Sequence, residues 1–342
     1  MIYVPPSGEV KAPTRSDATV AGGSAQCVCV LVLGMHRSGT SALARALSLM
    51  GATLPANVIG RSLGNDAGHW EPERLVAIND EILAELGSSW DDWRPLDMPA
   101  LAVDRREHYK SQIRTIIEEE YGSTKLFVLK DPRLCRFGLL YDEILTGLGV
   151  RTIYAIIYRN PLSVARSLAA RNGYSPEYST LLWLRHMLDS EQATRHRERS
   201  FVSYERLMEK WRDGVSDIAR QLGIGPQQWE APVGAFIDSQ LSPYLSHHVH
   251  TRSDLTRVDV LDAWVERTYD SFAALCEDPS DAAAVFTLDD VRRSFDPLAG
   301  PFGTAMYQEF ARMKAELDRL RAVEARLATA APETAGVPGT DK

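Results

Sequence analysis

The chain has 342 residues, of which 44% are hydrophobic, and its formal net charge is -8 at pH 7. This length and apolar content suit one large α/β domain or two small ones with a sizeable buried core. The acidic balance excludes a general attraction to nucleic acids or anionic membranes, so an anionic ligand would require a local concentration of basic residues.

The N-terminal segment 1–26 is rich in Pro, Gly and Ser and lacks the apolar stretch of a signal peptide, so we predict a flexible leader. No apolar run approaches the ~18 residues that a membrane-spanning helix requires. The four cysteines do not have the spacing of a zinc or redox site. These features predict a cytoplasmic protein with free thiols.

From residue 27 onward, short apolar runs alternate with helical patterns, which predicts an α/β fold with a central parallel sheet and helices on both sides. The predicted strands lie within residues 27–34, 125–133, 151–161 and 200–205. The predicted helices span about residues 41–50, 72–87, 104–121, 161–173, 177–197, 205–222 and 256–278. Together these elements would make one domain over residues 27–300.

Residues 301–330 are predicted to form a C-terminal helix, and residues 331–342 a disordered tail. Apolar residues recur in this helix at helical spacing. They are Phe310, Met313, Leu317, Leu320 and Val323. A short coiled coil, a docking helix or a plain surface helix would each produce this pattern. The coiled coil would make the protein a homodimer.

The first predicted strand passes through "GMHRSGTS", residues 34–41, directly into a helix. Such a turn exposes several backbone N–H groups to one point, and the helix N-terminus adds partial positive charge. Gly34 and Gly39 allow the tight turn and the close approach of an anion. The side chains that would bind the anion are those of His36, Arg37, Ser38, Thr40 and Ser41.

The loop differs from the nucleotide-kinase sequence GxxxxGK[ST], because Thr40 stands where that sequence has lysine. Arg37 supplies a fixed positive charge instead, and a guanidinium can bind two oxygens at once. A nucleotide triphosphatase would also need an acidic ligand for magnesium, for which Asp131 is available. The missing lysine makes a P-loop kinase the weaker interpretation.

A second cluster lies in "YRNPLSVARS", where Arg159 ends a predicted strand and Ser167 follows eight residues later in the next helix. The carboxyl ends of parallel strands are where open α/β sheets bind ligands. A second phosphate could therefore bind here, apart from the first.

Together, "GMHRSGTS" and "YRNPLSVARS" resemble the two cofactor signatures of sulfotransferases that use 3′-phosphoadenosine 5′-phosphosulfate (PAPS), over about residues 27–210. The resemblance implies a P-loop-like three-layer fold and a first loop, including Gly39, that holds the 5′-phosphosulfate. It also implies that Arg159 and Ser167 hold the 3′-phosphate. "SFVSYERL" is similar to a family segment whose tyrosine lies near the adenine, and Tyr204 has that place. The product would be 3′-phosphoadenosine 5′-phosphate (PAP).

Two basic residues resemble those of the carbohydrate and protein-tyrosine branch of this family. Arg37 stands immediately before "SGT", where the tyrosine sulfotransferases have arginine, which implies a contact with the leaving phosphate. Lys130, in "VLKDPR", is similar to the lysine of the "KDP" segment of that branch, which implies a contact with the sulfonate. A solvated lysine at the end of a strand is the alternative.

The acceptor hydroxyl needs a general base near its reacting face. In the same branch the base is a glutamate soon after the first helix, and Glu71 in "GHWEPE" is our first choice. Glu71 could instead cap the next helix. Asp131 is the second choice, although an Asp-Pro turn or a salt bridge with Arg133 would also explain it. His69 is the third.

Two further segments could lie near the reaction. "SSWDDWRP" places Trp90 and Trp93 beside acidic residues, a combination that suits a sugar or an aryl ring but equally a lid anchored in the core. "SHHVHTR" contains three histidines without a carboxylate or cysteine at the spacing of a metal site. By resemblance, His248 or Arg252 could cover the 3′-phosphate, although a solvated loop explains them as well.

The predicted function is transfer of a sulfuryl group from PAPS to a hydroxyl of a small molecule or a carbohydrate, by in-line displacement with a carboxylate base. No metal, nucleic acid or membrane partner is expected. The alternatives are a P-loop nucleotide-dependent kinase and a non-catalytic regulatory module that binds PAP or PAPS.

Overall fold

A four-stranded parallel sheet forms the centre of the computed structural model, which describes residues 26–59, 69–224, 234 and 262–330. The strands are β1 (Val28–Leu33), β2 (Leu126–Lys130), β3 (Arg151–Tyr158) and β4 (Arg199–Ser203). Their order across the sheet is β2-β1-β3-β4, and each neighbouring pair is parallel. The predicted α/β fold with a central parallel sheet is confirmed.

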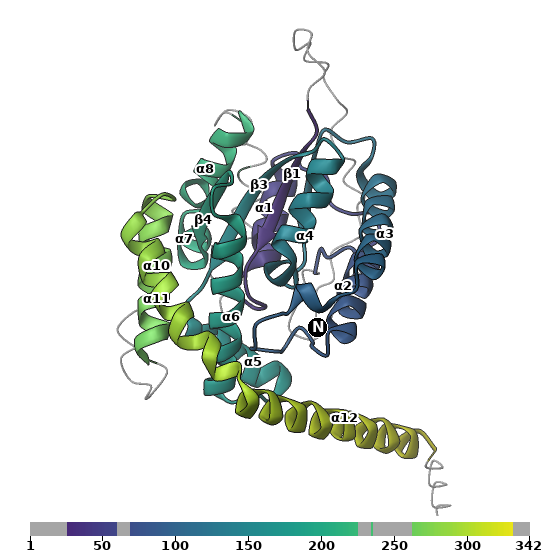
Figure 1. Ribbon diagram of the computed structural model, residues 1–342. Coiled ribbons are helices and arrows are strands. Elements are labelled where there is room, and N and C mark those ends of the chain that lie inside the picture. Colours follow the sequence, from purple (N-terminus) through teal and green to yellow (C-terminus); the bar gives the residue numbers. More distant parts are fainter. Residues whose placement is uncertain (1–25, 60–68, 225–233, 235–261, 331–342) are drawn as a thin grey trace, which may run out of the picture.

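Helices connect these strands and cover them on both sides (Figure 1). Up to β4 they are α1 (Thr40–Leu49), α2 (Glu73–Glu85), α3 (Val103–Tyr121), α4 (Leu134–Gly147), α5 (Pro161–Asn172) and α6 (Pro176–Thr194). After β4 they are α7 (Tyr204–Glu209), α8 (Trp211–Leu222), α10 (Asp262–Glu277), α11 (Ala282–Phe295) and α12 (Pro301–Ala330). Two 3-10 turns, η1 (Met98–Ala100) and η5 (Asp296–Ala299), complete the described elements.

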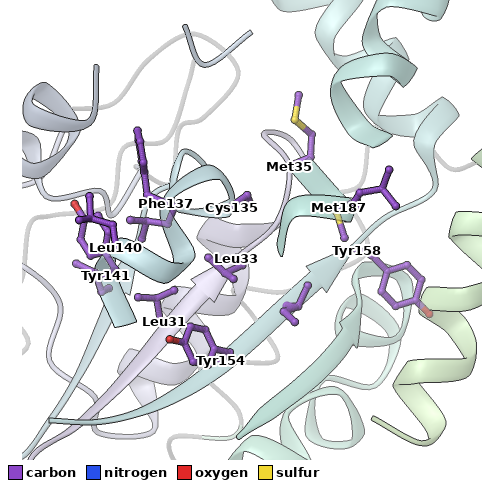
Figure 2. Close-up of a cluster of buried hydrophobic side chains, with 14 of the residues drawn as sticks. Leu31, Leu33, Met35, Cys135, Phe137, Leu140, Tyr141, Tyr154, Tyr158 and Met187 are labelled. Atoms are coloured by element: carbon purple, nitrogen blue, oxygen red, sulfur yellow. The ribbon is translucent and has the colours of Figure 1, made fainter. Parts of the chain in front are cut away.

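The two faces of the sheet are packed by different helices, because side chains alternate along each strand. Val30 and Val32 of β1 belong to the cluster formed with α1, α7 and α8. Leu31 and Leu33 belong to the larger cluster on the other face, which includes α4 and α6 (Figure 2). Being buried on both faces, β1 is apolar along its whole length, as is typical of a central parallel strand.

Three helical features differ from the sequence prediction. Helix α4 was not predicted, and it lies so close to α6 that a Cβ on Gly138 would be 2.7 Å from the Cβ of Ala193. Helix α11 was also missed, although Asp281 caps it by accepting hydrogen bonds from Ala283 N and Ala284 N. The helix expected over 205–222 is two helices, because Lys210 leaves the helical conformation at φ −144° and ψ 65°.

Apart from Gln26, the expected leader and tail lie outside the described residues, as does the start of the helix predicted over 256–278. In the part of the chain that the structure describes, the helices are all too short or too polar to cross a bilayer.

Candidate active site

The carboxyl edge of the sheet brings the predicted site residues together, since all four strands run in the same direction. β1 leads into the loop 34–39 and α1, and β2 ends at Lys130. β3 is followed directly by Arg159, and β4 by Tyr204. Four segments that are far apart in the sequence therefore end at one edge.

The loop between β1 and α1 has an unusual backbone. Arg37 has a φ of 70°, in the left-handed region that a residue other than glycine rarely adopts, and Gly39 has a φ of 93°. A strained non-glycine residue of this kind costs on the order of 1–3 kcal/mol and is typical of ligand-binding loops. Gly39 is the N-cap residue of α1 and provides no side-chain cap, so the first N–H groups of this helix can bind an anion.

Gly39 is required for packing as well as for its backbone angle, which gives a first prediction. A Cβ at this position would lie 2.2 Å from Cδ2 of Tyr204, so Gly39→Ala should lower the stability by about 1–3 kcal/mol and displace the tyrosine ring. The measurement is thermal unfolding. Gly51→Ala is the matched control, because Gly51 also has a positive φ, of 108°, but no atom lies within 4 Å of its Cβ position. Equal losses of stability in the two variants would contradict the role of the Tyr204 contact.

The two predicted anion-binding clusters adjoin one another. Arg37 Nε donates a hydrogen bond of 2.8 Å to Ser167 Oγ. Arg159 Nη1 donates one of 3.0 Å to the backbone oxygen of Arg37, and its guanidinium carbon lies 4.2 Å from the ring centre of Tyr204. The loop 34–39, the end of β3, α5 and the start of α7 thus meet around two arginines.

Burial disfavours the positive charges of Arg37 and Arg159. It lowers the pKa of both Arg37 and Arg159, and the positive charge of Arg159 lowers the pKa of Arg37 further. Two guanidinium groups held near each other in a partly buried place would gain from a bound anion. The electrostatics therefore match the ligand class that the loop backbone indicates.

A second polar cluster surrounds Lys130 at the end of β2. Its buried ammonium lies 2.5 Å from Glu71 Oε1, 3.1 Å from the backbone oxygen of His69 and 3.2 Å from Ser41 Oγ. Because Ser41 belongs to the first turn of α1, this cluster is joined to the phosphate loop. Lys130 is thus a buried, paired residue and not the solvated strand-end lysine of the alternative.

Glu71 is also buried and points into this cluster. Its side chain does not cap α2, whose N-cap residue Pro72 has no side-chain cap. Its second oxygen, Oε2, lies 3.9 Å from Arg133 Nη1, and His69 Nδ1 lies 3.9 Å from Oε1. Of the three residues considered as the base, Glu71 therefore contacts Lys130 with its side chain, and His69 contacts it with its backbone oxygen.

Asp131 is held by structural hydrogen bonds. Its Oδ1 accepts from Arg133 Nη1 at 2.9 Å and from the backbone N of Arg133 at 3.0 Å. Its Oδ2 accepts from Asn79 Nδ2 at 2.9 Å, and Asn79 in turn accepts from the hydroxyl of Tyr141. Both carboxylate oxygens are thus engaged in a buried network, which suits the salt bridge with Arg133 that the sequence left open.

His36 faces an aromatic wall at the side of the loop. Its ring centre lies 4.5 Å from that of Trp90, and its buried Nε2 has no hydrogen-bond partner among the described residues. Burial, and after it the charge of Arg171, lowers the pKa of His36 well below its ordinary value. Of the two tryptophans singled out in the sequence, Trp90 lies at this wall, whereas Trp93 packs in the core against Phe295.

Arg171 is a residue that the sequence analysis did not single out. It lies in the last turn of α5, and its guanidinium carbon lies 5.1 Å from the ring centre of Trp90. Burial lowers the pKa of His69, and the charges of Lys130 and Arg171 lower it further. The sequence contained a signal for Arg171, because it lies one turn beyond Ser167 on the same predicted helix. Only the fold shows that this turn faces the loop.

The predicted segment with His247, His248, His250 and Arg252 lies outside the described residues. Within the described ranges, no group of three or more His, Cys, Asp or Glu side chains is arranged to bind a metal ion.

No protein-family model matches the chain, and no curated protein matches it either. Among solved structures, it is similar to the sulfotransferase domain from the Synechococcus PCC 7002 olefin synthase, with 17% identity, a TM-score of 0.41, and coverage of 72% of this chain and 95% of that domain. It is also similar to the sulfotransferase domain from the Curacin biosynthetic pathway, with 16% identity, a TM-score of 0.39, and coverage of 69% and 93%. A proposal of function therefore depends on the chain's own residues.

Proposed function

We propose that the protein is a sulfotransferase that moves a sulfuryl group from PAPS to a hydroxyl of a small molecule or carbohydrate. The observation that carries the proposal is the junction of two anion-binding clusters through Arg37, Ser167 and Arg159. One adenosine compound with phosphates at both its 5′ and 3′ positions would occupy both clusters at once. Tyr204, already beneath Arg159, would lie beside its adenine.

When bound, PAPS supplies the sulfuryl group, whose bond to the 5′-phosphate oxygen breaks as the acceptor oxygen forms a bond to sulfur. The chain's residues position the two ends of this displacement. The N–H groups at the start of α1, together with Ser38, Thr40 and Ser41, would bind the 5′-phosphate. Arg37 would stabilise the charge that develops on the leaving phosphate, with Ser167 orienting its guanidinium.

Lys130 and Glu71 would act on the other side of the sulfur. Lys130 would contact the sulfonate, and the Glu71 carboxylate would accept the proton of the acceptor hydroxyl. Their contact of 2.5 Å holds both groups next to Ser41, at the phosphate loop. Asp131, whose two oxygens are already hydrogen-bonded, would hold Arg133 and support the site.

The acceptor would lie against Trp90 and His36. Trp90 offers a flat apolar surface next to Tyr174, with ring centres 6.2 Å apart, which suits the face of a sugar or an aryl ring. Natural products and carbohydrates with a free hydroxyl are the acceptor classes that this surface fits.

The decisive experiment incubates the full chain with isotopically labelled PAPS and a panel of sugars, phenols and aliphatic alcohols, and identifies sulfated products by mass spectrometry. We expect label in at least one acceptor class. Binding of PAP without any sulfated product would instead support a non-catalytic binding module. Absence of PAP binding would overturn the proposal.

A further inference from the structure

Helix α12 presents a continuous apolar stripe to solvent. Among the described residues, six of the ten exposed large hydrophobic side chains belong to this one helix. They are Phe302, Met306, Met313, Leu317, Leu320 and Val323. Exposed apolar surface gathered on one element, and not scattered, indicates an interaction surface.

The contacts with the body that the structure describes for this helix lie in its first half. Phe310 packs against Tyr178 with ring centres 4.6 Å apart, and Lys314 forms an ion pair with Asp91 at 2.5 Å. From residue 315 to residue 324 every side chain is exposed. Figure 1 shows the helix continuing away from the body beyond this point.

The projecting half lacks the packing that stabilises most helices in proteins. As a continuation of the docked first half it needs no nucleation of its own, but most helical stability in proteins comes from tertiary packing of an apolar face. Pairs such as Glu316 with Arg319, at 3.6 Å, add only a few tenths of a kcal/mol on an exposed surface. A helical partner on the apolar stripe would stabilise it.

The spacing of the stripe is that of a two-stranded coiled coil. Met306, Met313 and Leu320 are seven residues apart and take the d positions of a heptad, whereas Phe310 and Leu317 take a positions. Because Phe310 packs against Tyr178 of the body, the heptad is open to a partner helix from Met313 onward. The stripe lies to one side of the residues that contact the body, so a partner helix can reach it beside Leu317 and Leu320 without displacing Phe310.

The charges beside the stripe favour α12 of a second copy of this chain as the partner helix, and they favour a parallel arrangement of the two helices. In this heptad Glu316 is at a g position and Arg321 at an e position, whereas the e position Lys314 is already paired with Asp91 of the body. A parallel pair of identical helices places each g position beside an e position of its partner, so Glu316 meets Arg321. An antiparallel pair would place acid beside acid and base beside base.

We propose that α12 packs in parallel and in register against α12 of a second copy of this chain, forming a homodimer through a short coiled coil. The residues from Met313 to Leu320 make the seam, and Glu316 of each copy pairs with Arg321 of the other. Glu324, at the next a position, would face its own equivalent, so its like charge limits the affinity.

Sedimentation equilibrium on the full chain tests this association. We expect dimers at micromolar concentration, a loss of at least about 10-fold in dimer affinity for Leu320→Asp, and a gain for Glu324→Leu. Ala322→Asp is the matched control, because it adds the same charge to an exposed position on the opposite face. A monomer at about 100 μM, or equal effects of Leu320→Asp and Ala322→Asp, would overturn the proposal.

Charge exchange tests the direction. Glu316→Lys and Arg321→Glu should each weaken a parallel dimer, because each change places like charges beside one another, and an equimolar mixture of the two variants should restore it. An antiparallel dimer already has like charges side by side, so the single variants would leave its affinity unchanged, and that result would overturn the parallel arrangement. Leu320→Cys should form a disulfide between copies on oxidation, whereas Ala322→Cys should not. Failure of the mixture to recover, with no Leu320→Cys cross-link, would overturn the parallel arrangement. These readouts do not depend on sulfuryl transfer.

Discussion

Replacing Arg159 with alanine should weaken the binding of PAP by roughly 10- to 100-fold, while the binding of adenosine 5′-monophosphate, which lacks the 3′-phosphate, should change little. A charge-assisted hydrogen bond contributes about 1.5–3 kcal/mol, and each 1.4 kcal/mol is a factor of about ten in affinity. The effect should be specific to the 3′-phosphate because of where Arg159 lies. Its guanidinium bonds to the backbone of Arg37, whose own side chain contacts Ser167, and it lies over the ring of Tyr204. Isothermal titration calorimetry with the two nucleotides measures both affinities.

The pair of ligands separates a phosphate contact from general damage to the site. Arg159 also donates to the backbone of Arg37, so its loss could disturb the loop, but such damage would weaken both nucleotides. Arg220→Ala is the protein control, because Arg220 is an exposed arginine of α8 whose ion pair with Asp217 is at the surface. A parallel loss of affinity for both nucleotides in Arg159→Ala would refute the 3′-phosphate contact.

The strands and the site loop could be predicted from the sequence because their signals are local. Buried parallel strands are uninterrupted apolar runs, and the two glycines within the eight residues "GMHRSGTS" predict the turn. Parallel strands then place their carboxyl ends at one edge, so Lys130, Arg159 and Tyr204 could be expected near the loop once the strands were known.

The contacts within the site could not be predicted, because they depend on side-chain direction across long sequence separations. Nothing local to Arg37 shows that its guanidinium reaches Ser167, 130 residues away. Likewise, Glu71 and Asp131 are both acids near the predicted edge, and only the fold shows that Lys130 contacts one whereas Asn79 and Arg133 engage the other. Helix α4, by contrast, carried a local signal that the sequence analysis overlooked, since Phe137, Leu140 and Ile144 recur at helical spacing and are buried.

The structure also revises the idea of two separated pockets. Arg37 was expected at the leaving phosphate and Ser167 at the 3′-phosphate, yet the two side chains are hydrogen-bonded to each other. A guanidinium at this junction can reach an anion on either side, so Arg37 would couple the two clusters. Under the proposed function, recognition of the nucleotide and stabilisation of the leaving phosphate would therefore depend on the same residue.

Glu71→Gln is the second substitution for which we expect a large effect, a fall in turnover of about 10²- to 10⁴-fold with little change in the affinity for PAP. The amide keeps the shape of the side chain but cannot accept the proton of the acceptor hydroxyl. It also removes the countercharge of the buried Lys130 ammonium, and breaking such a pair costs about 3–5 kcal/mol, so thermal unfolding must be measured beside the rate.

The dependence of the rate on the acidity of the acceptor hydroxyl distinguishes a base from a residue that only positions Lys130. Acceptors of different acidity provide the readout. Glu71→Gln should lose less rate with an acidic phenol than with an aliphatic alcohol, because an acidic hydroxyl needs less help from a base. Lys130→Met should lower the rate by a similar factor for both acceptors, because the base is still present. Glu119→Gln, which removes an exposed carboxylate paired with Arg74, is the control for charge alone. Unchanged turnover in a folded, PAP-binding Glu71→Gln variant would transfer the role of base to Asp131, whose hydrogen bonds with Arg133 and Asn79 would then have to open during the reaction.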